Sequence, residues 1–273
     1  MTPPKSRRFL DMAIDKLGDK YGDPMRIRRA MASVVVAQMM PGGVVKGGSA
    51  LKIRYGNAMT RFTKDLDAAR NTDVVPYIQA FRERLAAGWC GFTGRIVEKE
   101  PPHPKDVPES YVMSPYDVKL DYCTKPWLTV QFELGHNELG DADEYDEELS
   151  SDIADAFMEL GFPRPAPVKL MALEYQLAQK LHAVTEPGGD RARDLVDLQI
   201  IANDSKLDFA KARRICERTF AYRKRHSWPP RMTDRDGWSE MYLDARGELP
   251  VLPEVTTAID WVNSLIDRIA TAT

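Results

Sequence analysis

The hydrophobic and polar positions of the chain divide it into three zones. In the first, residues 1–40, apolar side chains recur every three to four positions over residues 9–17 and again over 27–38, which is the spacing of an amphipathic helix. Asp23 followed by Pro24 is a typical start for the second helix, because aspartate caps a helix and proline fits its first turn. The pattern predicts an N-terminal helical extension that packs on the core.

The second zone, residues 41–149, mixes strands and helices. Short apolar runs predict strands at 44–45, 65–69 and 92–99, and helical spacing predicts helices over 50–55 and 76–85. A proline-rich loop is expected at 101–108. Apolar and polar residues alternate over 116–122 and 128–134, with Thr124, Lys125 and Pro126 between them, and this predicts a β-hairpin.

The third zone, residues 150–273, is helical. Apolar stripes predict helices that begin near residues 151, 173, 190, 208 and 254. Together the zones predict an α/β (α+β) fold, in which a lobe with a mixed sheet is followed by a C-terminal α-helical lobe.

Composition places the chain among globular proteins. Its 273 residues are 43% hydrophobic and 29% charged, which excludes disordered and fibrous classes. The longest apolar run, residues 34–37, is far shorter than the roughly 20 residues of a membrane helix, and no secretory signal is expected. Three widely spaced cysteines argue against a disulfide or zinc scaffold. We therefore expect a cytoplasmic protein with no membrane partner.

The net charge of −3 hides an uneven distribution. Residues 206–231 carry nine Lys or Arg residues against two acids, whereas residues 138–152 carry eight acids and no Lys or Arg. Separate sectors of this kind allow a mildly acidic chain to hold a polyanion on its basic side. The acidic run itself is expected to form a solvated loop and a helix start.

A glycine-rich turn, Lys46-Gly47-Gly48-Ser49, connects the first strand of the second zone to a helix. It is not a Walker A loop, because Gly48 stands where that motif has lysine. A strand-to-helix turn still exposes backbone N–H groups, so Gly48 and Ser49 are candidate ligands of a nucleoside triphosphate. The alternative is a tight turn in which Ser49 only caps the helix.

Asp65 and Asp67 are candidate metal ligands. Residues two apart in a strand point to the same side, so their carboxylates should lie a few Å apart. Like charges that close are costly unless a cation neutralises them, and Mg²⁺ (or Mn²⁺) is the natural choice beside phosphate. The alternative is an exposed sheet edge that carries two surface acids.

Glu133 is a candidate third acid, on the polar side of the strand over 128–134. If this strand neighbours the strand of Asp65 and Asp67, the three carboxylates converge in the arrangement that holds two metals for nucleotidyl transfer. Glu133 could otherwise be a surface residue. The weaker rivals are Asp117, Asp121 and Asp141.

Several motifs, in the same order, resemble a known family. Segments 46–51, 54–56 and 61–67 resemble the signature of the AbiEii/AbiGii-type nucleotidyltransferases, and segments 179–183 and 193–198 resemble the two C-terminal motifs of that family. Trp228-Pro229-Pro230 resembles its MenT branch. The fifteen residues between Ser49 and Asp65 exceed the spacing in many superfamily members, and an AbiEii-type insertion accounts for the difference.

The resemblance implies a polymerase-β-like nucleotidyltransferase lobe and a metal-dependent enzyme of a toxin–antitoxin system. Such a toxin transfers a nucleoside monophosphate from an NTP to an RNA 3′ end, with the tRNA acceptor end as the expected target, and so blocks translation. A cognate antitoxin is an expected partner. Two alternatives stay open: transfer to a protein hydroxyl, and a non-catalytic nucleotide-binding protein of the same fold.

Lys180 and Asp194 lie in the C-terminal motifs, each at the spacing of an apolar helix stripe. The resemblance implies that Lys180 binds the nucleotide phosphates and that Asp194 orients it, while the alternative for Lys180 is a snorkelling or ion-paired surface residue. Asp197 is the less favoured partner of Lys180. Arg191 and Arg193 are salt-bridge partners or phosphate ligands, and the sequence does not separate these roles.

The basic segment 206–231 interleaves cations with aromatic residues, the elements of an RNA-binding surface. Arg223, Lys224 and Arg225 are the candidate RNA contacts, and a solvated helix face is the alternative. Thr63 is a candidate regulatory site, because a phosphate two residues before Asp65 would add negative charge beside carboxylates that already repel each other. The alternative is a hydroxyl that only hydrogen-bonds its own turn.

Overall fold

The computed structural model describes residues 2–100 and 113–273, so the predicted proline-rich loop at 101–108 lies outside the described residues. The chain divides into two compact units, which are described one by one. Unit 1 comprises Met1–Ala58 and Phe62–Met171, and unit 2 comprises Met59–Arg61 and Ala172–Thr273.

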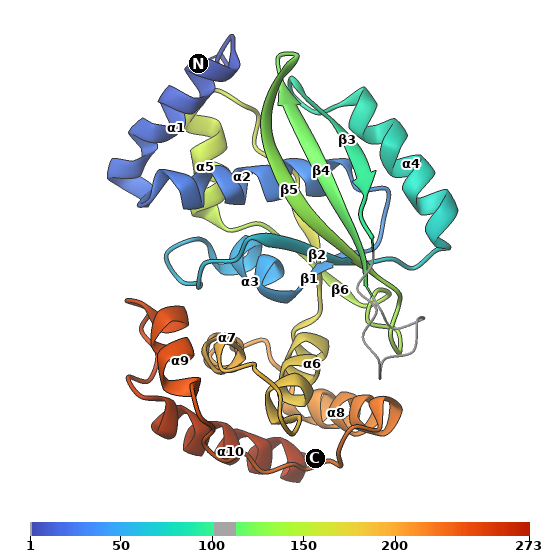
Figure 1. Ribbon diagram of the computed structural model, residues 1–273, viewed down its shortest axis with the longest axis vertical. Coiled ribbons are helices and arrows are strands. Elements are labelled where there is room, and N and C mark those ends of the chain that lie inside the picture. Colours follow the sequence, from blue (N-terminus) through green and yellow to red (C-terminus); the bar gives the residue numbers. More distant parts are fainter. Residues whose placement is uncertain (1, 101–112) are drawn as a thin grey trace. The chain divides into compact units, whose positions relative to one another are not determined.

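Within the described residues, unit 1 holds a seven-stranded sheet in the order β3-β4-β5-β2-β1-β7-β6 (Figure 1). The strands are β1 (Val44–Lys46), β2 (Asp65–Ala69), β3 (Phe92–Glu98), β4 (Ser114–Tyr122), β5 (Lys125–Gly135), β6 (Tyr145–Glu148) and β7 (Val168–Met171). The pairs β2–β5 and β1–β7 are parallel, and the other neighbours are antiparallel. The predicted mixed sheet is therefore confirmed.

The β4–β5 hairpin forms where alternation predicted it. Val130, Phe132 and Leu134 are buried on one side of β5, between more exposed polar residues. Cys123 and Thr124 connect the strands with φ of 46° and 65°, the conformation that matches a two-residue turn to the twist of its strands. The turn lies earlier than predicted, and Lys125 and Pro126 already belong to β5.

Five helices of unit 1 pack around this sheet within the described residues. They are α1 (Arg7–Tyr21), α2 (Pro24–Met39), α3 (Gly47–Tyr55), α4 (Val74–Ala87) and α5 (Ser151–Glu159). Asp23 caps α2 by accepting a hydrogen bond from the Met25 amide at 2.9 Å. Helices α1 and α2 contact each other and β5, and their apolar faces lie in the main core.

The division between the units falls after Met171, later than the predicted boundary at 149/150. Helix α5 packs on α1 and α2, and strand β7 pairs with β1 and β6, so both belong to unit 1. Neither β6 nor β7 was predicted. β6 lies in the acidic run and has no alternating apolar residues that would predict a strand. β7 is only four residues long.

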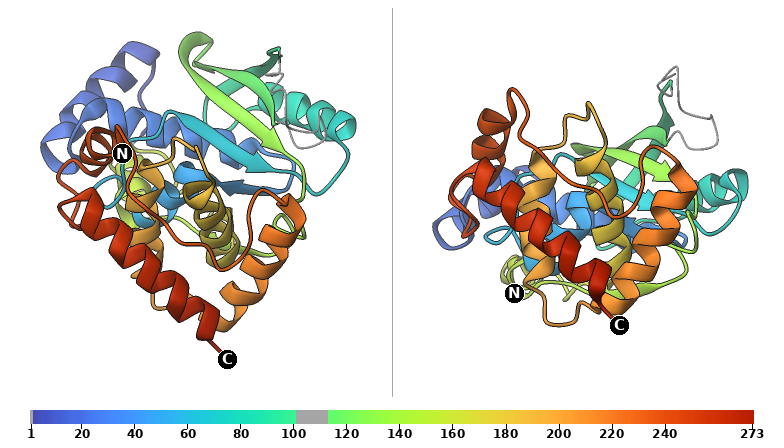
Figure 2. Two further views of the ribbon diagram at one scale, coloured as in Figure 1. Left: turned by 60° about the horizontal axis from the view of Figure 1, so that its bottom comes forward. Right: turned by 90° about the horizontal axis from the view of Figure 1, so that it is seen from below.

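Unit 2 is helical in its described residues. Its helices are α6 (Leu173–Thr185), α7 (Arg193–Ala202), α8 (Phe209–Arg223), α9 (Trp238–Arg246) and α10 (Val255–Thr271). Helix α6 packs between α7 and α8, and α10 runs across α7, α8 and α9 (Figure 2). The short α9 was not predicted. It is anchored by Trp238 and Tyr242, which are almost fully buried.

Candidate active site

Strand β2 places Asp65 and Asp67 beside Glu133. β2 pairs in parallel with β5, with Asp67 directly opposite Glu133 and Asp65 opposite Gln131. All three acids are half-buried, and Leu66 between the aspartates is fully buried on the other face. The condition under which Glu133 would join the two aspartates, that the two strands are neighbours, is met. We refer to Asp65, Asp67 and Glu133 as the sheet acids.

The rival acids are engaged elsewhere. Asp117 and Asp121 lie on β4 near Lys99 and Arg95, with ion-pair distances of 3.8 and 3.9 Å. Asp141 is buried in the turn after β5, where its carboxylate accepts a hydrogen bond from the Glu138 amide at 2.7 Å. Glu133 is therefore the acid that the fold brings to the β2 aspartates.

The sheet acids repel one another. Burial, and then the charges of Asp67 and Asp65, raise the pKa of Glu133 above its usual value, although Lys46 and Lys99 act in the opposite direction. Among the described residues, neither Asp65 nor Glu133 forms a salt bridge. The arrangement therefore holds negative charge at close range without full compensation by the protein.

A divalent cation fits this group by its chemistry. The donors are carboxylate oxygens, which Mg²⁺ and Mn²⁺ favour, and Mg²⁺ is commonly held by one or two carboxylates together with water and substrate phosphates. Residues 2–100 and 113–273 contain no group of three or more His, Cys, Asp or Glu side chains that could hold a metal ion.

The glycine-rich turn is built against Asp67. Gly47 has a φ of 64°, and a Cβ atom at this position would overlap Asp67 Oδ2. Only glycine satisfies both demands, because it alone adopts positive φ at no steric cost and leaves room for the carboxylate. Sequence reasoning singled out Gly48 and Ser49 but missed Gly47, whose role depends on a contact with a strand twenty positions away.

Ser49 joins the turn to β2. Its hydroxyl donates to the Lys46 carbonyl at 3.0 Å and accepts from the Asp67 amide at 3.3 Å. Helix α3 begins at Gly47, and its N-cap residue Lys46 makes no side-chain capping bond. The alternative that Ser49 is the helix cap is thus wrong. Its hydroxyl fixes Asp67 relative to the turn, and Gly48 stays buried at the start of α3.

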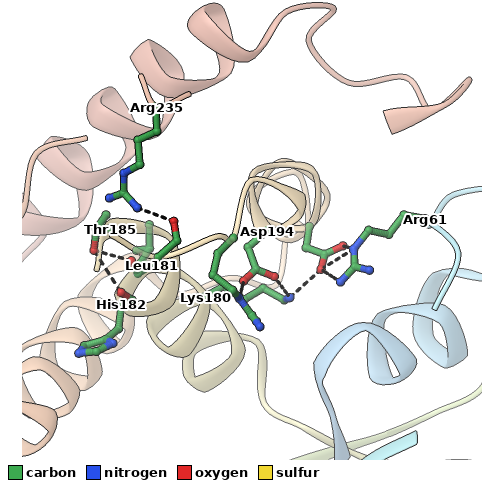
Figure 3. A network of polar contacts seen from close by, with 10 residues as sticks. Arg61, Lys180, Leu181, His182, Thr185, Asp194 and Arg235 are labelled. Carbon is green, nitrogen blue, oxygen red and sulfur yellow. Dashed lines mark hydrogen bonds and ion pairs between the residues drawn. The ribbon is translucent and has the colours of Figure 1, made fainter. Parts of the chain in front are cut away.

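Unit 2 holds a second charged group, centred on Lys180 of α6 (Figure 3). The Lys180 ammonium donates to Asp194 at 2.8 Å and to Asp197 at 2.6 Å. Two nitrogen atoms of the Arg61 guanidinium donate hydrogen bonds to the Asp197 carboxylate at 2.9 to 3.1 Å. Arg191 donates to Asp194 at 2.8 Å. We call these five residues the lysine cluster.

Charge compensation is strong in the lysine cluster. Burial alone would lower the pKa of Lys180, but the charges of Asp194 and Asp197 outweigh it and hold this pKa above its usual value. Lys180 and Arg191 likewise keep the pKa of Asp194 low, against the effect of burial. Asp197, expected as the less favoured partner, contacts Lys180 as closely as Asp194 does. Arg191 acts as a salt-bridge partner, whereas Arg193 is exposed.

Arg54 was missed as a structural residue. Its guanidinium is buried and contacts Asp146 at 2.8 Å and Glu148 at 3.3 Å. It also donates to the Met171 carbonyl at 3.3 Å. Part of the acidic run thus forms a strand that is held by a buried arginine, and the expectation of a solvated loop is wrong for Tyr145–Glu148.

At least four of the nine cations in the basic segment form ion pairs. Lys211 pairs with Glu174, Arg213 with Glu217, Arg225 with Glu186 and Arg231 with Asp267, at 2.7 to 3.5 Å. Arg223 ends α8, and Lys224 follows it in a left-handed conformation with φ of 55°. The excess of positive charge is therefore less available to a polyanion than the composition indicates.

Thr63 lies in the loop that leads into β2. It is half-buried, and its carbonyl accepts a hydrogen bond from Lys52 at 3.3 Å.

No helix in the described part of the chain is both long and apolar enough to cross a membrane.

Comparisons with known proteins agree with this geometry. A family model described as "Nucleotidyl transferase AbiEii toxin, Type IV TA system" matches residues 29–262. Curated proteins give no match. Among solved structures, the chain is similar to MenT4, nucleotidyltransferase toxin Rv2826c from Mycobacterium tuberculosis H37Rv, with 18% identity and a TM-score of 0.54 over 96% of this chain and 88% of that one. At this identity the likeness shows the fold alone.

Proposed function

The chain belongs to the AbiEii nucleotidyl transferase toxin family of type IV toxin–antitoxin systems, and we propose that its sheet acids support transfer of a nucleoside monophosphate from an NTP to an RNA 3′ end. The tRNA acceptor end is the favoured target, and its modification would block translation. Membership of the family implies a cognate antitoxin. We place the reaction in the cytoplasm.

The observation that carries the proposal is the alignment of Asp67 with Glu133 across β2 and β5, with Asp65 two residues away. Asp65, Asp67 and Glu133 would hold divalent cations, which when bound supply charge neutralisation for the triphosphate and acidify the attacking hydroxyl. The residues of the chain keep this negative site in place. Because Gly47 has no Cβ atom, the Asp67 carboxylate can lie against it, and the Ser49 hydroxyl accepts a hydrogen bond from the Asp67 amide.

The turn before α3 supplies the complementary part of the site. Backbone N–H groups at the start of a helix favour negative charge, because they have no partner inside the helix. We propose that the amides of Gly48 and Ser49 bind the triphosphate there. The backbone, rather than the Ser49 hydroxyl, carries this role, since that hydroxyl already bonds Lys46 and Asp67.

Lys180 and Asp194 are the phosphate ligand and its orienting partner by the family resemblance, yet Lys180 is already held by two carboxylates. We propose that Asp194 and Asp197 together fix the position of the Lys180 ammonium. Arg223, Lys224 and Arg225 are proposed to contact RNA phosphates, with Arg225 weakened by its bond to Glu186.

The test is incubation of pure protein with Mg²⁺, each labelled NTP in turn, total tRNA and a protein pool, which are then separated. We expect label at RNA 3′ ends, and none with Asp67→Asn. Label in the protein pool would favour transfer to a protein hydroxyl. NTP binding with no transfer to either pool would favour the non-catalytic alternative.

A further inference from the structure

The loop between α3 and β2 carries an exposed aromatic ring with two cations near it. Phe62 is 38% exposed, and it precedes Asp65 by three residues. The Arg29 guanidinium lies 5.9 Å from the centre of the Phe62 ring, and the Lys52 ammonium lies 5.3 Å from it. All of these residues belong to unit 1, so the arrangement is internal to the unit that holds the sheet acids.

Arg29 differs from the other arginines near this loop. Its Nε atom is buried without a hydrogen-bond partner, and among the described residues Arg29 has no carboxylate partner. The Nε atom of Arg28, the preceding residue, is likewise buried without a hydrogen bond. Arg28 differs because its guanidinium pairs with Asp11 and Asp15 at 3.3 and 3.0 Å. Burying part of a cation without an anion is unfavourable, so the site is electrostatically incomplete and would be completed by an anionic ligand.

The loop that carries Phe62 is held in place from both sides. Arg26 of α2 donates to the Asn57 carbonyl at 2.7 Å, and Lys52 of α3 donates to the Thr63 carbonyl at 3.3 Å. α2 and α3 also contact each other (Figure 1). Since the loop is tied to two helices, Phe62 is presented by a supported backbone immediately before the strand of Asp65 and Asp67.

A single-stranded nucleic acid fits this combination. Bases stack on aromatic rings, phosphates bind arginine and lysine, and proteins that bind single strands combine both contacts. We propose that Phe62 stacks on a terminal base of the RNA acceptor, while Arg29 binds the adjoining phosphate. The inference rests on the proposed function and deepens it, because it assigns the surface that receives the RNA 3′ end to unit 1 rather than to the paired cations of α8.

The experiment measures RNA binding without NTP, so that binding is separated from transfer. The probe is a single-stranded RNA oligonucleotide with 2-aminopurine as its 3′-terminal base, whose fluorescence falls when the base stacks. We expect Phe62→Leu to weaken binding about 5- to 150-fold and to abolish the quench, whereas Phe62→Tyr keeps both. Arg29→Gln should reduce the salt slope by about 0.7 to 0.9.

The matched controls are Phe9→Leu and Arg8→Gln on α1. Phe9 is 58% exposed and Arg8 is exposed, so each control removes the same type of side chain from another surface of unit 1. Neither should alter the quench or the salt slope. Circular dichroism of every variant confirms that the fold is retained, and Phe62→Tyr is the variant least open to a folding defect.

The outcomes separate the two claims. If wild-type protein modifies RNA while Phe62→Leu and Arg29→Gln bind the oligonucleotide as the wild type does, the surface assignment is overturned and the proposed function stands. If Phe62-dependent binding occurs without any transfer, the surface stands and the proposed function fails. Absence of a quench with the wild type, or labelling of protein in place of RNA, overturns the surface assignment.

Discussion

The sheet acids of unit 1 and the lysine cluster of unit 2 both contain partly buried charges, but they differ in how far these charges are paired. In the lysine cluster, each aspartate contacts two cations, and Lys180 contacts both aspartates. In the sheet, three carboxylates lie on neighbouring strands, and neither Asp65 nor Glu133 forms a salt bridge with any described residue. The charges of the lysine cluster are paired within the protein, whereas for the sheet acids we propose a bound cation.

This difference is expected to separate residues that stabilise the fold from residues that, under the proposed function, bind a ligand. A buried charge that is fully paired costs stability when a partner is removed, because the other charge stays behind unpaired. Acids that repel one another cost stability while they are present, and their removal should not harm the fold. Activity and stability should therefore respond in opposite ways in the two clusters.

The largest effect is expected from neutralising a sheet acid. Asp67→Asn keeps the shape of the side chain and removes one carboxylate, so nucleotide transfer should fall by on the order of 10² to 10³ or more, since a metal supplies several kcal/mol to such a reaction. Asp65→Asn should behave alike. Thermal unfolding should be unchanged or shifted upward. Transfer by a well-folded Asp67→Asn protein would remove the site from the sheet.

The lysine cluster should show the converse in a stability measurement. Asp197→Asn leaves Arg61 and the buried Lys180 without their shared carboxylate, and we expect a loss of about 3 to 5 kcal/mol in urea unfolding. Arg191→Gln is the control, because Arg191 is exposed and its loss should cost about 1 kcal/mol or less. Equal stability of Asp197→Asn and wild type would mean that the cluster is not structural.

Thr63 is a position at which negative charge can be added beside the sheet acids. Thr63→Glu places a carboxylate two residues before Asp65, and we expect transfer to fall about tenfold or more with little change in stability. Thr63→Ser, which keeps the hydroxyl, should retain activity. This pair of variants tests whether modification of Thr63 could switch the enzyme off. A fully active Thr63→Glu protein would end that idea.

The smallest effect is expected in the basic segment of unit 2. Neutralising Arg223, Lys224 and Arg225 together should lower the salt slope of tRNA binding by about 1 to 2, less than three unpaired cations would give, because Glu186 already holds Arg225. NTP affinity should not change. If the slope is unaltered, these residues do not contact RNA, and the Arg29 surface carries the electrostatic contact.

Local patterns were sufficient to predict β2, the hairpin and the described helices other than α9, since each depends on spacing within one segment. The pairing of β2 with β5 was predicted only as a condition, because periodicity does not specify which strands become neighbours. Arg54 was missed for the same reason: its partners Asp146 and Glu148 lie more than ninety residues away. The acids of the 138–152 run were treated as solvated because charge usually indicates exposure.

In the candidate site too, residues were predicted where the signal lies within one segment and missed where it depends on contacts between segments. Asp65 and Asp67 were identified by their own spacing, and Glu133 by its position on an alternating strand. Gly47 was missed because the need for glycine arises from Asp67, which packs against it. The sharing of Lys180 between Asp194 and Asp197 depends on how α6 and α7 pack, and helical spacing alone placed both aspartates only approximately.

The most direct test of the central claim is Mn²⁺ binding, followed by electron paramagnetic resonance, in the presence of a non-hydrolysable NTP analogue. Because neither Asp65 nor Glu133 forms a salt bridge with a described residue, we predict that the wild type binds Mn²⁺ and that Asp67→Asn and Glu133→Gln bind it far more weakly. Arg191→Gln, in the compensated cluster, should bind as the wild type does. Equal Mn²⁺ binding by wild type and Asp67→Asn would contradict the claim that the sheet acids form the metal-holding centre.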